Sequence, residues 1–151
     1  MKIILIEDDD IKRSHILELL AARYPEAEVV TAKSYNSGLE AVTMLNASIV
    51  LLDMTLTTFD VGSEEDGGSP RALAGMELMG QMDRHEVRTP VIVVTQYDVF
   101  QEGTGRSTLA ELETRLYLAY PDLYRGAVYY NHASDAWKDS LAKLIEAGAL
   151  R

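Results

Sequence analysis

The stretch Ser48-Ile49-Val50-Leu51-Leu52-Asp53 decides the fold, because four apolar residues in a row run directly into one carboxylate. A short continuous apolar run containing Ile and Val is typical of a strand buried on both faces of a parallel sheet. In open parallel sheets, ligands bind beyond the carboxyl ends of the strands. The stretch therefore predicts that Asp53 lies where such a sheet binds its ligand.

The rest of the chain alternates predicted strands with predicted helices around this stretch. Further strands are predicted at residues 2–6, 27–32, 91–94 and 126–130. Helix starts are predicted at Asp9 or Asp10, at capping boxes formed by Ser37-Gly38-Leu39-Glu40 and Thr108-Leu109-Ala110-Glu111, at Ser69-Pro70, and at Ser134 or Asp135. Strands that alternate with helices imply right-handed crossovers. We therefore expect an α/β fold, a doubly wound five-stranded parallel sheet of flavodoxin-like order 2-1-3-4-5 with helices on both faces, as a single domain over residues 1–151.

Two polar, glycine-containing segments interrupt this pattern, at about residues 55–69 and 96–107. Both are predicted to be long loops, and both begin at the carboxyl edge of the sheet. Long loops in compact domains are usually functional or disordered. We expect these two to form a lid, a partner surface or a homodimer contact. The stripe of Met76, Met79 and Met82 between them is interpreted first as core packing.

Composition narrows the class of function. The chain has 24 Asp and Glu against 14 Lys and Arg, a formal net charge of -10, which argues against direct nucleic-acid binding and favours a cationic partner or a bound metal ion. Cys is absent, which excludes disulfides and Cys nucleophiles and fits a cytoplasmic protein. No apolar run approaches the length that spans a membrane.

Polar groups follow three of the predicted strands: Glu7 and Asp8 follow the first, Asp53 the third and Thr95 the fourth. In the order 2-1-3-4-5 these strands are neighbours, so we expect the groups to converge. A cluster of acids without a compensating Lys or Arg is costly, and a hard cation relieves that cost. Mg²⁺ prefers carboxylates, waters and a phosphate. The sequence therefore predicts a magnesium site at this edge.

Three segments together resemble the receiver domain of two-component response regulators. They are Ile4-Leu5-Ile6-Glu7-Asp8-Asp9, Ile49-Val50-Leu51-Leu52-Asp53 and Pro90-Val91-Ile92-Val93-Val94-Thr95. The resemblance covers the whole chain in the right order. It implies a domain that takes a phosphoryl group from a kinase phosphohistidine onto one aspartate.

Carried over residue by residue, the resemblance assigns Asp53 as phosphoacceptor and metal ligand. Asp8 would bind Mg²⁺ directly, Glu7 through water, and Thr55 through its carbonyl, while Thr95 would contact the phosphoryl group. The implied partners are a histidine kinase or phosphotransfer protein and a downstream protein. Any enzymatic activity would be at most Mg²⁺-dependent self-phosphorylation and dephosphorylation at Asp53.

The chain departs from the family at the end of the fifth predicted strand, where the family places a Lys. This sequence has Tyr130-Asn131-His132 there, and the nearest Lys, Lys138, belongs to the last helix. Tyr130 falls near the family's switch aromatic. Asn131 or His132 could donate one hydrogen bond in place of the Lys, but a neutral donor does not supply its charge.

Two main functions remain open. The first is a stand-alone receiver, with no effector domain following, that relays its signal by protein–protein interaction. The alternative is a pseudo-receiver, a protein-binding module that phosphorylation does not switch. A Mg²⁺ hydrolase of the toprim kind would want a second acid where Thr55 stands. Flavodoxin-like cofactor binding is disfavoured by the acids after the first strand, and a phosphate-binding P-loop is absent.

Overall fold

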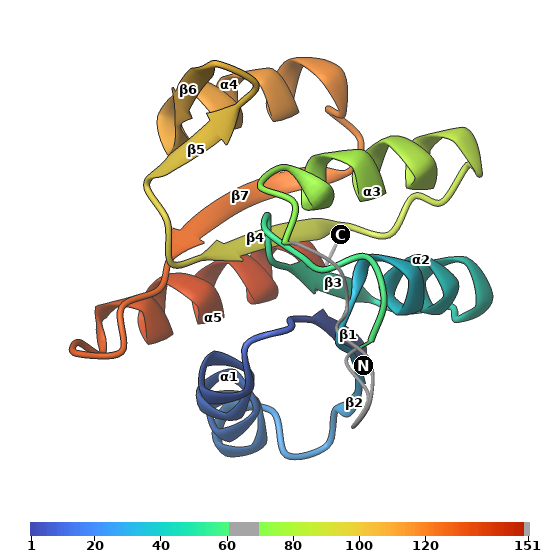
Figure 1. Cartoon of the computed structure of the whole chain (residues 1–151). Helices are drawn as coiled ribbons and strands as arrows, with labels where there is room; N and C mark the ends of the chain where they lie inside the picture. The colour runs from blue at the N-terminus through green and yellow to red at the C-terminus, as the bar shows by residue number, and fades with distance from the viewer. Residues whose placement is uncertain (61–69, 150–151) are drawn as a thin grey trace.

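The fold is a parallel sheet with helices on both faces, seen in a computed structural model that describes residues 1–60 and 70–149. Within these residues, five strands form the sheet in the order β2-β1-β3-β4-β7 (Figure 1). They are β1 (Lys2–Ile6), β2 (Glu28–Ala32), β3 (Ile49–Leu52), β4 (Val91–Thr95) and β7 (Tyr124–Tyr129). All neighbouring pairs are parallel. The predicted order 2-1-3-4-5 is confirmed, with β7 as the fifth parallel strand.

In the described part of the chain, five helices cover the two faces of this sheet. Two of them, α1 (Asp10–Arg23) and α5 (Ala136–Ala149), lie on one face (Figure 1). The other face carries α2 (Tyr35–Met44), α3 (Ala74–Arg84) and α4 (Leu109–Ala119). Within the described residues, no helix is both long enough and apolar enough to cross a membrane.

The continuous apolar runs are explained by burial on both faces. Along β1, Ile4 and Ile6 belong to the core under α2, α3 and α4, whereas Ile3 and Leu5 belong to the core under α1 and α5. Successive side chains of a strand point to opposite faces, so a strand between two cores must be apolar throughout. The same logic makes all four residues of β3 buried.

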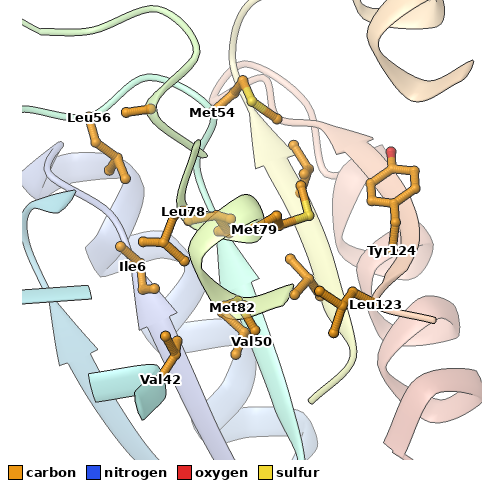
Figure 2. Close-up of a cluster of buried hydrophobic side chains, with 14 of the residues drawn as sticks. Ile6, Val42, Val50, Met54, Leu56, Leu78, Met79, Met82, Leu123 and Tyr124 are labelled. Atoms are coloured by element: carbon orange, nitrogen blue, oxygen red, sulfur yellow. The ribbon is translucent and has the colours of Figure 1, made fainter. Parts of the chain in front are cut away.

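The methionine stripe of α3 packs as predicted. Met79 and Met82 are fully buried and lie among the side chains of β3 and β7 in the core under α2, α3 and α4 (Figure 2). Met76 is partly buried at the rim of the same core. Unbranched Met side chains fill irregular gaps between a helix and a twisted sheet, so this stripe needs no ligand to explain it.

The helix starts were predicted with mixed success. Asp9 caps α1 by accepting a hydrogen bond from the Lys12 N–H at 2.9 Å, and the capping box of Thr108 with Glu111 opens α4 as expected. The box predicted at Ser37 was wrong, because α2 already begins at Tyr35 and Ser34 is its cap. Ser37 there takes the position that the usual box gives to Glu or Gln.

The start of α3 at Ser69-Pro70 was also predicted wrongly. The helix begins at Ala74. Leu56 and Arg71 form an antiparallel bridge with N–O distances of 2.9 and 3.2 Å, and this pairing holds the backbone extended just where the predicted helix would begin. Residues 61–69 of the predicted first loop lie outside the described part of the chain.

The second predicted loop is instead largely a hairpin. Strands β5 (Val99–Glu102) and β6 (Gly105–Thr108) pair antiparallel around a turn in which Gly103 has φ +62°. Phe100 is buried in the core under α2, α3 and α4, and Thr108 both ends β6 and caps α4. The prediction of a loop was wrong because polar residues dominate the hairpin, which has one large apolar side chain pointing inward.

Candidate functional site: a carboxylate cluster at the sheet edge

Three carboxylates meet where β1 and β3 end. Ile6 and Leu52 are register partners in these neighbouring strands, and the Asp53 N–H donates to the Ile6 carbonyl at 3.1 Å. Glu7, Asp8 and Asp53 each offer one carboxylate oxygen within 4.8 Å of the others. The parallel register therefore brings together the three acids that the sequence placed at this edge.

The cluster also contains a cation, so the expectation of acids without a compensating Lys or Arg was wrong. Lys12 projects from the first turn of α1, with its Nζ 2.6 Å from Glu7 Oε1 and 3.3 Å from Asp53 Oδ2. It also donates to the Val94 carbonyl at 2.6 Å. Only 1% of the Lys12 side chain is exposed. The ammonium is thus a buried member of the site.

A sequence signal for Lys12 existed but was not used. Lys12, Ile16 and Leu20 lie four residues apart along α1 and all three are buried. Residues at this spacing share one face of a helix. A Lys within the apolar stripe of a helix that follows an acidic strand end points back toward those acids, which is where the structure places it.

The charges of the cluster perturb one another. Burial, aided by the nearby Asp53, raises the pKa of the Glu7 carboxyl to about 9 against the opposing attraction of Lys12. Burial and then Asp53 also raise the pKa of Asp8. Burial alone would lower the pKa of Lys12, but Asp53 and Glu7 outweigh it and the pKa is raised. Three carboxylates against one ammonium therefore hold more negative charge than this buried edge favours.

One oxygen of the cluster is left without a partner. Asp53 is 4% exposed, and its Oδ1 is buried with no hydrogen-bond partner among the described residues. Asp53 nevertheless borders a hollow of about 180 Å³ that Asp8 and Thr55 also line. Hard carboxylate oxygens in surplus, beside a hollow, suit Mg²⁺. The residues present thus fit the predicted ion, with Asp8, Asp53 and Glu7 as the donors that would hold it.

A larger hollow of about 440 Å³ lies elsewhere, bordered by Tyr35 of α2, Met76 of α3 and Tyr120, the residue after α4. It contains no member of the carboxylate cluster. Volume alone does not define a site, so we place the site at the smaller hollow, where the unpartnered Asp53 oxygen and the perturbed carboxyls are found.

The two threonines assigned from the family lie at the same edge. Thr95 is fully buried at the end of β4, where its Oγ1 accepts from the Tyr97 N–H at 3.2 Å. The Thr55 hydroxyl donates to the Ala72 carbonyl at 3.2 Å. Their assigned roles toward a phosphoryl group and a metal stay predictions.

The segment after β7 is packed differently from the cluster. Tyr130 is 3% exposed, its hydroxyl lies 2.5 Å from His15 Nδ1, and its ring packs edge-on against Trp137 with centroids 5.0 Å apart. The Asn131 side chain accepts from the Ala133 N–H at 2.9 Å, and His132 is exposed. Among the described residues, the ammonium against Asp53 comes from α1 and not from this segment.

Comparisons with known proteins agree with this geometry. No family model matches the chain. The Detocs response regulatory protein DtcB of Enterobacter cloacae (strain JD6301) is 31% identical over 147 residues, 94% of this chain and 97% of the relative. The uncharacterized protein y4jR of Sinorhizobium fredii (strain NBRC 101917 / NGR234) is 28% identical, covering 93% of this chain and 94% of that protein.

Solved structures share the fold at lower identity. The response regulator domain of Thermotoga maritima CheB matches with a TM-score of 0.68 at 15% identity, covering 100% of this chain and 97% of that one. The response regulator TrrA from Thermotoga maritima, solved in complex with Mg(2+)-BeF, matches with a TM-score of 0.58 at 20% identity, covering 95% and 97%. Together with the identity to a named response regulatory protein across nearly its whole length, the fold and the site lead to one conclusion: this chain belongs to the response regulator receiver family.

Proposed function

We propose that this chain accepts a phosphoryl group on Asp53 from the phosphohistidine of a histidine kinase or phosphotransfer protein, in a Mg²⁺-dependent reaction, and passes the signal on by binding a downstream protein. The observation that carries the proposal is the Asp53 Oδ1 at the end of β3, which has no hydrogen-bond partner in the part of the chain that the structure describes. A buried carboxylate oxygen ordinarily has a hydrogen-bond partner. A carboxylate oxygen that lacks a hydrogen-bond partner and lies beside a hollow is available to bond an incoming group.

The chemistry asks little of the protein beyond positioning and charge neutralisation. An Asp53 oxygen bonds to phosphorus as the bond from phosphorus to the donor imidazole nitrogen breaks. The electron pair stays on that nitrogen, which takes up a proton from solvent. Mg²⁺ held by Asp8, Asp53 and Glu7 would supply neutralisation of the phosphoryl oxygens. Thr95 is proposed to contact the same oxygens, and the Thr55 carbonyl to complete the metal site.

The relatives support this proposal, which also includes a cellular location and a set of partners. The curated relative is named a response regulatory protein, and TrrA was solved with Mg(2+)-BeF, which supports acceptance of a phosphoryl group here. We place the reaction in the cytoplasm, in a single domain that acts without direct contact with nucleic acid or membrane. A second copy of the chain is a further candidate partner.

The test is the intact mass of the protein after incubation with acetyl phosphate. We expect one added phosphoryl group with Mg²⁺, little without it, and none in Asp53→Asn. Asp10→Asn is the matched control, since Asp10 is an exposed acid of the same edge that pairs with Arg13 and lies outside the cluster. An adduct that survives Asp53→Asn would overturn the proposal.

The pseudo-receiver alternative is favoured by one observation, the packing of Tyr130. Its buried ring and its short contact with His15 hold the proposed switch position in place. Trp137 is the single Trp of the chain and packs on Tyr130, so its fluorescence reports on this position. Mg²⁺ with beryllofluoride should change that fluorescence in a switching receiver. Partner binding that is indifferent to Asp53→Asn, with unchanged fluorescence, would support the alternative.

A further inference from the structure

The proposed function gives no task to Lys12, although this buried ammonium touches the acceptor itself. We propose that Lys12 is the positioning residue of the site: it holds Asp53 by Oδ2 and leaves Oδ1 as the oxygen that takes the phosphoryl group. The inference rests on the proposed function. It follows from two contacts seen together, the 3.3 Å approach of Nζ to Oδ2 and the absence of a partner for Oδ1 among the described residues.

The position of the ammonium is fixed on three sides. Besides Asp53 Oδ2, it meets Glu7 Oε1 and the Val94 carbonyl, each at 2.6 Å. An ammonium has three donors, and here three acceptors from β4 and from the segments after β1 and β3 match them. The helix that carries Lys12 is capped by Asp9 and packs through Ile16. Lys12 therefore stays in the cluster rather than turning out to solvent.

This arrangement makes the two Asp53 oxygens unequal. A charge-assisted contact draws negative charge toward the held oxygen, so Oδ2 is the poorer nucleophile. Oδ1 has no hydrogen-bond partner among the described residues, so its lone pairs stay available to the Mg²⁺ and to phosphorus. The contact also fixes the carboxylate plane, because rotation about the Asp53 side chain would break the ion pair. Positioning of this kind is what phosphoryl transfer requires of the protein.

The same contacts account for the missing Lys at the end of β7. Val94, which binds the ammonium, precedes Thr95, and the Thr95 carbonyl accepts from the Tyr130 N–H at 2.7 Å. The positive charge thus reaches the end of β4 from α1, while the first residue after β7 is bonded there by its backbone alone. The site has its cation without any contribution from residues 130–132.

The experiment uses the absence of Cys from the chain. Lys12→Cys is unfolded, alkylated with 2-bromoethylamine to restore an ammonium or with iodoacetamide to leave a neutral side chain, and refolded with its fold checked by circular dichroism. With acetyl phosphate and Mg²⁺, we expect the neutral form to be phosphorylated about 10- to 100-fold more slowly than wild type, as for loss of one hydrogen bond to a charged group. The aminoethyl form should recover most of the rate. Lys138→Cys, treated identically, is the control, because Lys138 lies on α5 and its ion pair with Asp135 is at the surface.

A second readout uses the unmodified protein and does not depend on rate. With ¹⁵N-labelled Lys, the buried Lys12 ammonium should give a slowly exchanging signal that shifts when Mg²⁺ and beryllofluoride are added. Equal rates for the two alkylated forms, or a Lys12 signal that does not move, would overturn the role of Lys12 while leaving phosphorylation of Asp53 standing. A wild-type protein that gains no phosphoryl group would overturn both proposals.

Discussion

The first turn of α1 and the segment after β7 approach the same sheet edge from two sides, but they bring different chemistry to it. Lys12 from α1 places a buried ammonium against Glu7 and Asp53. Tyr130 after β7 brings an aromatic ring whose hydroxyl bonds back to His15 on α1. The two meet within one neighbourhood, with Lys12 Nζ 6.0 Å from the centre of the Tyr130 ring.

The difference shows that an ammonium can lie beside Asp53 although its residue is far along the sequence from the place where the family has its Lys. From the family resemblance, the cation is expected after the fifth parallel strand. In this chain the ammonium among the carboxylates comes from α1 instead. Here α1 supplies the charge and the β7 side supplies packing.

The largest effect is expected from removing the charge of α1. Lys12→Met should lower the free energy of unfolding by about 3 kcal/mol, because it leaves buried carboxylates without their partner. Urea unfolding measures this. Lys138→Met, which removes a half-exposed Lys from a surface pair on α5, should change the value by less than about 0.5 kcal/mol. Equal losses in the two variants would mean that Lys12 is not part of a buried ion pair.

Crowding the end of β3 from the opposite face should have the next largest effect. A Cβ on Gly75 would lie 2.6 Å from the Asp53 carbonyl and 2.9 Å from Met54 Cα. Gly75→Ala should therefore cost about 1–3 kcal/mol of unfolding free energy and shift the Asp53 amide signal.

Gly80→Ala is the matched control in the same helix. There the new Cβ meets only the end of the Tyr120 side chain, at 3.1 Å. That side chain can move, and the exchange of Gly for Ala favours the helix by up to about 1 kcal/mol. A stability change as large as that of Gly75→Ala would argue against a special contact between α3 and the end of β3.

Altering the β7 side should have a smaller effect. Tyr130→Phe removes the contact with His15 but keeps the ring against Trp137, and should cost about 1 kcal/mol of unfolding free energy. Tyr129→Phe, at the half-exposed neighbouring position, is expected to stay within about 0.5 kcal/mol. If Tyr130→Phe destabilised the protein as much as Lys12→Met, the segment after β7 would contribute as much to stability as the buried ammonium of α1, contrary to expectation.

The smallest effect concerns an acid held by hydroxyls instead of an ammonium. The hydroxyls of Ser34 and Ser37 donate to Asp60 at 2.6 and 2.7 Å and lower its pKa below the usual range. A lowered folded pKa adds stability above the ordinary Asp value of about 3.9 and loses it as the pH falls through the folded value.

The corresponding measurement is urea unfolding of wild type and Asp60→Asn at several pH values. Wild type should be more stable by less than about 1 kcal/mol at pH 6, and the gap should narrow toward pH 3. A gap that is constant with pH would show that the Asp60 charge does not contribute.

Much of the framework could be predicted because it depends on simple periodicities. The buried runs ending at Ile6 and Leu52 predicted their strands, and parallel order then brought Glu7 and Asp53 together. Lys12 was missed because motifs were sought where strands end, while it reaches the site from a helix. The helix start at Tyr35 and the hairpin after Val99 were missed because they depend on tertiary contacts, with Asp60 beside Ser34 and with the core around Phe100.

The hairpin of β5 and β6 has a consequence for partner binding. Thr108 joins it to α4 without an intervening residue, and Arg115 of α4 binds Glu102 of the hairpin at 2.9 Å. The Leu109 N–H also donates to the Asp98 carbonyl at 2.8 Å. Hairpin and helix thus form one continuous unit, which joins the end of β4 through the short segment after Thr95 and packs on the core through Phe100. A protein that bound the hairpin would therefore contact an element that follows directly on the strand end beside Asp53.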